Sequence, residues 1–338
     1  MANADFSYIV TNLSNFVANN GELLSSQVAY GTPTVKRVTP QNVKYKAKIN
    51  FLSLTGGFQD GKGCATEYNS TAVLTDREIE TAILERKWRI CPDTLLGKYP
   101  EYLVRIPADK RDSLPFEAFL VSEIIIAVND ELETLVWQGD TDDSDLIDGY
   151  LTLASDDSSV IDVSISAGTS AYAAIKAVIA AIPAKLKRKS KVFVSPEFYS
   201  QLAFEAVDAK LPYVDSGESM MVGGIEVILT PGLAGADYIY ASPVENMFYG
   251  SDDHDAQNRV KVGYNDEYGY FYVLVRFNAG VQHAFGDWIV LGAIGGDLVS
   301  PDANVALERI AASNEEIAEV MGDVFNESKN SINTTATA

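Results

Sequence analysis

The sequence predicts an α+β protein, and three patterns along the chain predict that class. Apolar and polar residues alternate over residues 43–51, as they do in a half-exposed β-strand. Apolar residues keep helical spacing over residues 114–137, which is about twice the length of an average helix. Helix and strand patterns then alternate from residue 170 onward, which indicates an α/β unit. A chain of 338 residues is long enough to hold more than one subdomain.

Residues 1–42 are expected to form an N-terminal arm. Six apolar residues at helical spacing predict a short amphipathic helix that ends at residues 19–21. These residues are Phe6, Ile9, Val10, Leu13, Phe16 and Val17. Residues 25–42 lose this pattern and contain Gly31, Pro33 and Pro40, so a connector outside any compact core is expected there.

Residues 43–92 are expected to form an extended β-hairpin. Tyr45, Ala47, Ile49 and Phe51 would share one face of its first strand, with Lys44, Lys46, Lys48 and Asn50 on the other. A glycine-rich tip follows at residues 56–63, and a second strand is expected over residues 79–90. Thr75 and Glu78 have the spacing of a capping box, so a helix is the alternative for this limb, but a strand is favoured.

The rest of the chain is expected to divide into four parts. A first part over residues 93–140 would carry the long helix, which at 1.5 Å per residue spans roughly 36 Å and ends at Gly139. An α/β part is expected over residues 141–265. Residues 266–300 would form strands that return to the first part, and residues 301–338 would form a C-terminal tail with one helical apolar stripe.

Within the α/β part, a helix is expected over residues 170–182 and a strand over residues 191–194. Ser195 and Pro196 have the residue types of an N-cap and a first helical position, so a second helix is expected to begin there. Short strands are expected between Gly, Pro and Asp turns at residues 225–229, 238–240, 260–264, 270–277 and 288–291.

The chain has only two histidines and two cysteines, which argues against a metal site or an acid–base site built from these residues. Its two histidines, His254 and His283, lack metal-ligand spacing; His254 lies in an acidic loop, and His283 lies in an apolar strand where a structural role is expected. Cys64 and Cys91 are too few for a disulfide scaffold or a cysteine-rich zinc site and suit a reducing compartment.

Other catalytic templates also find no match. The acidic run at residues 140–145 lacks the sixth-position glycine and the final glutamate of a calcium loop. The glycine-rich stretches at residues 232–235 and 292–296 match no nucleotide-binding pattern, and no Gly-x-Ser-x-Gly is present. We therefore expect a protein that is not an enzyme, with no catalytic, cofactor-binding or metal-binding residues and no cofactor.

Charge and hydropathy exclude further classes. The formal net charge of −21 repels phosphate backbones, so tight nucleic-acid binding is not expected. The basic residues gather at residues 36–48 and 185–191, and the acidic ones at residues 140–148 and 252–255, a segregation that head-to-tail self-association can use. No secretory signal is visible at the start, and no apolar run is long enough to span a bilayer.

Several segments stand in an order that resembles a known family. Cys91-Pro92-Asp93-Thr94-Leu95 follows the hairpin, and residues 115–138 form the long spine helix before Gly139-Asp140. Residues 191–197 lead into the second helix of the α/β part. Residues 224–227, Pro231-Gly232 and the strand at residues 270–277 follow in order. Over about residues 40–300 this organisation resembles the Hong Kong 97-type fold of the major capsid proteins of tailed bacteriophages, a likeness of fold rather than of a site.

The resemblance implies a structural subunit in which residues 93–140 and 266–300 form a peripheral domain with the spine helix, and residues 141–265 form an α/β axial domain. Family members assemble as hexamers and pentamers into an icosahedral head that encloses double-stranded DNA, so the chain's main partner would be itself. The short segment before the hairpin hints at a separate scaffolding protein, with portal and decoration proteins as further partners. The subunit would assemble in the bacterial host cytoplasm and reside in the virion, without sequence-specific DNA binding and without a membrane.

Two alternatives stay open. An encapsulin-like compartment has the same fold and holds a cargo enzyme, and the gene neighbourhood would separate it from a phage capsid. A soluble α/β enzyme or binding protein is the other, with its site near Asp140 or Asp252. Some family members crosslink a hairpin lysine to an asparagine, but Lys62 at the hairpin tip has no assignable partner here, so this chemistry is not carried over.

Overall fold

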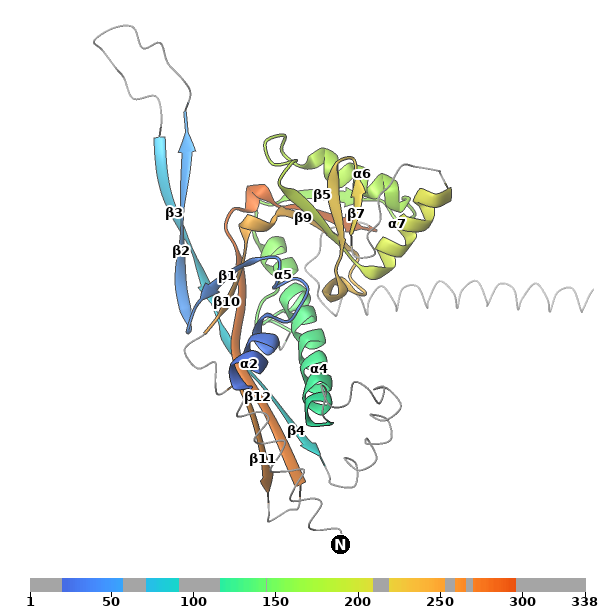
Figure 1. The fold of residues 1–338 in the computed structure, drawn as a ribbon. Helices are drawn as coiled ribbons and strands as arrows, with labels where there is room; N and C mark the ends of the chain where they lie inside the picture. Colours follow the sequence, from blue (N-terminus) through green and yellow to red (C-terminus); the bar gives the residue numbers. More distant parts are fainter. Residues whose placement is uncertain are drawn as a thin grey trace, which may run out of the picture. The chain divides into compact units, whose positions relative to one another are not determined.

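A computed structural model describes residues 20–56, 71–90, 116–143, 145–208, 219–252, 259–265 and 270–295 (Figure 1). The chain divides into two units, residues 1–297 and 298–338. The predicted arm helix, most of the hairpin tip with Lys62, both cysteines, His254 and the C-terminal tail lie outside the described residues. Within the described residues, no helix has the length and apolarity needed to cross a bilayer.

A six-stranded mixed sheet forms the α/β part. Its strand order is β5-β13-β9-β6-β8-β7, and the pairings are parallel between β5 and β13 and between β6 and β8. The strands are β5 (Ile161–Ile165), β6 (Ser190–Val194), β7 (Ser219–Val222), β8 (Ile225–Leu229), β9 (Tyr238–Pro243) and β13 (Val290–Ile294). The strand and helix alternation predicted from residue 170 onward is confirmed.

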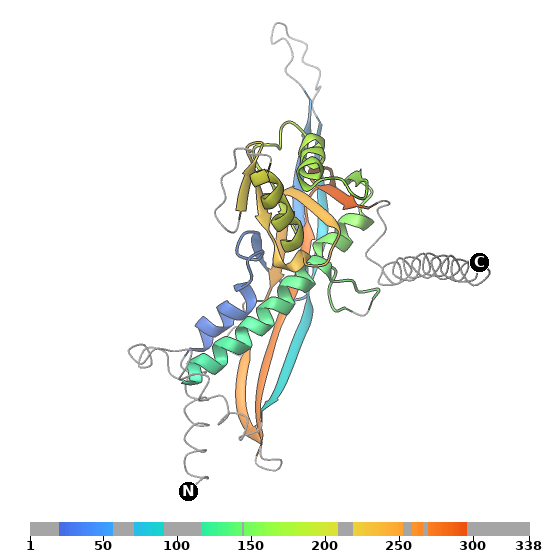
Figure 2. The same ribbon diagram turned by 90° about the vertical axis from the view of Figure 1, so that its right-hand side faces the viewer.

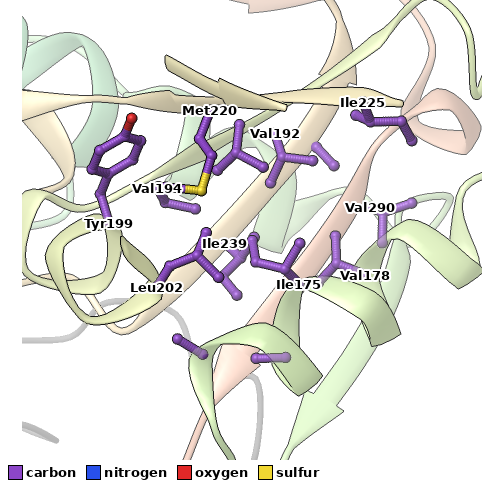
Figure 3. Packing of buried hydrophobic residues seen from close by; sticks show 14 of the residues in the cluster. Ile175, Val178, Val192, Val194, Tyr199, Leu202, Met220, Ile225, Ile239 and Val290 are labelled. Carbon is purple, nitrogen blue, oxygen red and sulfur yellow. The ribbon is translucent and has the colours of Figure 1, made fainter. Parts of the chain in front are cut away.

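The helices α6 (Ala171–Ala181) and α7 (Pro196–Asp208) pack on one face of this sheet. Figure 3 shows Ile175 of α6 and Leu202 of α7 beside Val192 and Ile239 of the strands, all of them fully buried. Successive strand residues point to opposite faces, so each strand supplies every second residue to this core.

Both helices begin with a serine N-cap, which the sequence predicted for Ser195 but not for Ser170. The Ser170 hydroxyl accepts a hydrogen bond from the Ala173 amide at 3.3 Å, and the Ser195 hydroxyl accepts one from the Phe198 amide at 3.3 Å. Each bond satisfies an amide that the first helical turn leaves without an intrahelical partner.

A second sheet is organised around the 14-residue strand β12 (Tyr270–His283). β11 (Val260–Asn265) and β10 (Met247–Ser251) pair with successive parts of β12, and β1 (Thr39–Asn42) pairs parallel with β10. β4 (Ala82–Ile90) pairs antiparallel with β12 over nine positions. β12 is longer than the predicted strand at residues 270–277, and β1 and β10 were not predicted.

The predicted spine is confirmed as α4 (Phe116–Gln138), a helix of 23 residues that lies beside β4 and β12 (Figure 2). Its last turn carries Trp137, which is fully buried. The Trp137 ring lies 5.4 Å from Tyr150 of α5 (Tyr150–Asp156), 5.1 Å from Phe193 of β6 and 5.3 Å from Tyr240 of β9. Since Val192 and Val194 face α6 and α7, Phe193 points to the opposite face of the sheet, and Trp137 joins the spine to that face.

The backbone around Trp137 is closely packed. A Cβ atom on Gly232 would lie 2.5 Å from Trp137 Cδ1 and 2.3 Å from the Glu133 carbonyl oxygen. A Cβ atom on Gly149 would lie 2.5 Å from the Trp137 carbonyl oxygen. Gln138 donates to the Gly232 carbonyl at 2.6 Å, so the end of the spine is held by side-chain packing and by hydrogen bonds.

The connector predicted over residues 25–42 is wrong in part. Residues 21–30 form helix α2 (Gly21–Tyr30), in which Leu24, Val28 and Ala29 are buried, and Val35 and Val38 of the following turns are buried as well. α2 packs on α4, a contact about 100 residues away that local sequence periodicity does not reveal.

A buried polar network fastens this segment to the spine. The Thr34 hydroxyl donates to the Glu133 carboxylate and accepts from Trp137 Nε1 at 2.7 Å, and the Thr34 amide donates to the same carboxylate at 3.2 Å. Burial raises the pKa of Glu133, and the hydrogen bonds from Thr34 partly offset this. One hydroxyl group therefore satisfies two buried polar groups of α4.

The hairpin's second strand begins earlier than predicted. β2 (Lys46–Thr55) pairs with β3 (Thr71–Glu80) from Lys46↔Glu80 to Thr55↔Thr71, whereas residues 82–90 leave the hairpin as β4. Most of β3 is exposed on both faces, so its sequence has no apolar alternation to mark it. Thr75 and Glu78 both lie in β3, which confirms the strand over the helix.

Removing the Thr34 hydroxyl tests the network. Thr34→Val leaves Trp137 Nε1 and one Glu133 oxygen without this partner, so we expect the free energy of unfolding to fall by about 1–3 kcal/mol. Thr34→Ser is the matched control, which keeps the hydroxyl and is expected to cost about 1 kcal/mol or less. Urea unfolding of the unassembled chain measures both, and equal losses in the two variants would contradict the network.

Candidate assembly surfaces

The β2–β3 hairpin extends away from the second sheet (Figure 1), and large apolar side chains are exposed in its outer part. Leu52, Leu54 and Leu74 lie on one face of the hairpin, because Leu52 pairs with Leu74 and Leu54 is two residues further along β2. They are 58%, 71% and 69% exposed, respectively. Val73 on the other face is 47% exposed. A two-stranded ribbon with both faces exposed cannot bury these side chains by itself.

The root of the hairpin, by contrast, is packed on the second sheet. Ile79 is fully buried, and Ala47, Ile49 and Phe51 pack against a small cluster formed by Val43, Ile79, Phe248 and Ala284. The Phe51 ring lies 5.9 Å from Phe248 and 5.1 Å from Phe285. The predicted apolar face of β2 is therefore confirmed for these three residues, whereas Tyr45 is 57% exposed.

Ion pairs line the opposite face of the root. Lys46 Nζ lies 2.7 Å from Glu80 and 3.2 Å from Glu78, and Lys48 Nζ lies 2.6 Å from Asp76. Cross-strand pairs of opposite charge favour this register, although each exposed pair contributes little free energy. The predicted lysine face thus lies on the hairpin surface.

A three-residue charge cluster connects the hairpin root to the body. Arg77 of β3 forms an ion pair with Asp157, which follows α5, and its Nη1 lies 2.8 Å from His283 Nε2 at the end of β12. His283 Nε2 lies 2.9 Å from the same Asp157 oxygen, and the Ser159 hydroxyl donates to the other at 2.6 Å. Asp157 lies 80 residues from Arg77 and 126 from His283 in the sequence. Sequence reasoning expected a structural role for His283 but did not find these partners.

Burial sets the protonation of this cluster. His283 is 1% exposed, and burial lowers its pKa; the hydrogen bond to Asp157 opposes the shift, and the Arg77 charge adds to it. Burial alone would raise the pKa of Asp157, but hydrogen bonds from His283, Ser159 and Arg77 outweigh it and hold the pKa well below its usual range. The cluster therefore holds a carboxylate and a neutral imidazole at neutral pH.

The carboxylates of the acidic run at residues 140–148 accept hydrogen bonds from groups of the same turn. The Asp140 carboxylate accepts from the Asp142 amide at 2.9 Å, and Asp145 accepts from the Asp140 amide at 3.1 Å. Asp148 accepts from the amide and hydroxyl of Thr141 at 2.9 and 2.7 Å. Within the described ranges, no three His, Cys, Asp or Glu side chains group as metal ligands would.

The two sheets, the spine helix that joins them and the exposed hairpin have the fold seen in solved capsid structures, among them a satellite-phage procapsid and the capsid of a GTA particle. The particular structures that it matches bear out the predicted likeness to Hong Kong 97-type major capsid proteins at the level of fold. Identities of 10–14% establish the fold alone.

The procapsid of satellite phage P4, solved with its size determination protein, matches with a TM-score of 0.54 at 12% identity, covering 81% of this chain and 99% of that one. The capsid of an empty GTA particle matches with a TM-score of 0.53 at 14% identity, covering 80% and 91%. Gordonia phage Cozz matches with a TM-score of 0.52 at 10% identity, covering 78% and 86%. No model of a known protein family matches the chain, and no curated protein sequence matches it.

Titration of His283 tests the charge cluster. Because its pKa in the folded chain lies below the value of 6.5 for an unperturbed histidine, the unfolded chain binds more protons just below pH 6.5. The contribution of His283 to stability is therefore present above pH 6.5 and declines as the pH falls toward the folded pKa. We expect His283→Gln to lose this decline between pH 7 and pH 5, as measured by urea unfolding.

His254→Gln, which changes the only other histidine, is the control and should keep the wild-type profile. A wild-type pH slope in His283→Gln would show that His283 does not titrate in this window.

Proposed function

We propose that this chain is the major capsid protein of a tailed bacteriophage, which assembles as hexamers and pentamers of an icosahedral head enclosing double-stranded DNA. The observation that carries the proposal is the exposed apolar surface of the hairpin, on a subunit with the fold of phage capsid proteins. The protein acts as a structural element of the virion and not as an enzyme.

The energetics of the hairpin support self-assembly. Burying one leucine side chain contributes roughly 1.5–3 kcal/mol, so Leu52, Leu54 and Leu74 together offer several kcal/mol to a surface that covers them. The root is fixed to the body by Phe51, Ile79 and the Arg77 cluster, so the two strands extend as a pre-ordered element. A pre-ordered element loses less entropy on docking than a disordered one.

The remaining assignments belong to the same proposal. The proposed parts are the hairpin within residues 43–92, the spine within 93–140 and an axial domain within 141–265. The expected boundary at residue 265 needs correction, because β10 and β11 pair with β12 in the second sheet and β13 pairs with β5 and β9 in the six-stranded sheet. A separate scaffolding protein, a portal and decoration proteins are the proposed partners. The net charge of −21 suits a container that encloses DNA without gripping it by sequence, and assembly would take place in the host cytoplasm.

Expression of the chain, alone and with neighbouring phage genes, tests the proposal. We expect shells or capsomer rings by size exclusion and negative-stain microscopy, with DNA inside particles made in the presence of the packaging genes. Shells that hold a cargo enzyme and no DNA would favour the encapsulin-like compartment. A monomer at high concentration, even with a scaffolding protein present, would exclude both.

The hairpin leucines offer a sharper test. Leu52→Asp with Leu74→Asp removes the apolar pair and adds charge at an exposed position, so we expect an intact fold and an assembled fraction at least about tenfold lower, since about 1.4 kcal/mol corresponds to a factor of ten. The assembled fraction is measured by sedimentation and the fold by circular dichroism.

Asn50→Asp with Thr75→Asp is the matched control. It adds two carboxylates at exposed positions nearer the root and leaves the leucines in place. This control should assemble nearly as the wild type does. Equal assembly of the leucine variant and the wild type would contradict the role given to the hairpin.

A further inference from the structure

One face of the second sheet is basic on a strongly acidic chain. In β4, β11 and β12, the residues that alternate with the buried Val273, Val275 and Leu84 point away from this core. The register places four cations and one carboxylate on that outer face, here named the basic sheet face. They are Lys87, Arg89, Lys261, Arg276 and Glu85.

The charge on this face is only partly balanced within the subunit. Glu85 lies 2.6 Å from Lys87 and 3.9 Å from Arg276, so one carboxylate serves two cations. The side chains of Lys87 and Arg276 are 65% and 54% exposed. Lys261 is exposed, and in the described part of the chain it has no carboxylate within ion-pair distance.

The face is also hollowed. A hollow of about 500 Å³ is lined by Lys44, Lys261, Arg276 and Arg259, with Asp252 as its acidic residue. Arg259 is 3% exposed and is held by the Ser25 carbonyl at 3.3 Å and by the Asp252 carbonyl, so one cation of the hollow is fixed in place. A basic hollow with one cation fixed in place has a potential complementary to that of an acidic protein surface.

The same chain presents an acidic counterpart elsewhere. The acidic edge is here defined as Asp140, Asp142 and Asp148, in the connection between α4 and α5, together with Asp156, the last residue of α5. Burial raises the pKa of Asp156, and the negative charges of Asp148, Asp140 and Asp142 raise it further. A second hollow, of about 430 Å³, is lined by Asp148 together with Glu78 and Glu80 of the hairpin. Glu78 and Glu80 are paired with Lys46, whereas in the described part of the chain no lysine or arginine side chain lies within ion-pair distance of the four carboxylates of the acidic edge.

We propose that the basic sheet face of one copy of this chain docks against the acidic edge of the next copy. The inference rests on the proposed function and names the contact that sets the order of subunits around a ring. Two different and complementary surfaces on one chain make a head-to-tail contact, which generates closed rings when the rotation between copies closes. The contact guides orientation, since like-charged faces repel.

A second copy is favoured over DNA as the occupant. Phosphate recognition gains from many cations with few nearby carboxylates, and this chain carries 47 acidic against 26 basic residues. The basic sheet face includes Glu85, and its hollow includes Asp252, both of which repel phosphate. The acidic edge offers carboxylates, which pair with lysine and arginine in charge-assisted hydrogen bonds.

A charge swap tests the inference. Variant one carries Lys261→Glu and Arg276→Glu, variant two carries Asp142→Lys and Asp156→Lys, and variant three combines all four changes. We expect the assembled fraction to fall about tenfold or more in variants one and two and to recover most of the loss in variant three. Sedimentation measures assembly, and circular dichroism of the unassembled fraction verifies the fold.

Lys185→Glu with Arg188→Glu is the matched control, because both residues are exposed outside the basic sheet face and the net charge changes as in variant one. It should assemble within about twofold of the wild type. Loss in this control as large as in variant one would overturn the inference, since net charge alone would then explain the effect.

The remaining outcomes separate this contact from the proposed function. If the wild type forms shells and variant one forms normal shells as well, the inference is overturned while the capsid proposal stands. The same holds if variant three does not recover the assembly lost in variants one and two. Normal shells from variant one that have lost their DNA would assign the face to nucleic acid instead and would also overturn it. A wild type that forms no shells contradicts the capsid proposal itself, and the inference falls with it.

Discussion

The packing of Trp137 holds the two halves of the described structure together. Its ring contacts α5 through Tyr150 and the six-stranded sheet through Phe193 and Tyr240, and its Nε1 donates to Thr34 of the N-terminal segment. The spine helix therefore ends inside the α/β part and not on its surface. Truncating a buried aromatic residue of this kind typically costs about 3–5 kcal/mol, a large share of the stability of a domain.

The hairpin is attached to this body at its root and is exposed in its outer part. Phe51, Ile79 and the Arg77–Asp157–His283 cluster attach the root firmly, while Leu52, Leu54 and Leu74 further out are exposed. A firmly attached element with an exposed apolar end suits contact between copies better than it suits a monomer. In the proposed head-to-tail contact, the basic sheet face and the acidic edge would add direction that apolar burial alone does not give.

Local sequence patterns predicted the elements whose signals are local. The apolar periodicity of the spine, the Ser195-Pro196 start of α7 and the alternation of β2 each depend on neighbouring residues, and each is confirmed. Helix α2 was missed because its short apolar stripe is buried by α4, far along the chain. β3 was missed because a strand exposed on both faces has no alternation to detect.

The candidate surfaces could be predicted only in part. The exposed lysines of β2 follow from alternation, but the basic sheet face depends on the register that brings Lys261, Arg276 and Lys87 together from three strands. The cluster at the hairpin root joins residues up to 206 positions apart, and no local pattern specifies such a contact. Pairing partners and long-range polar contacts are properties of the tertiary fold, and a single sequence does not reveal them.

The most direct test of the account is the structure of the assembled particle by cryo-electron microscopy at a resolution that shows side chains. We expect a closed shell in which Leu52, Leu54 and Leu74 of each subunit are buried against a neighbouring copy. A particle in which these leucines remain exposed to solvent, or a protein that stays monomeric under all assembly conditions, would contradict it.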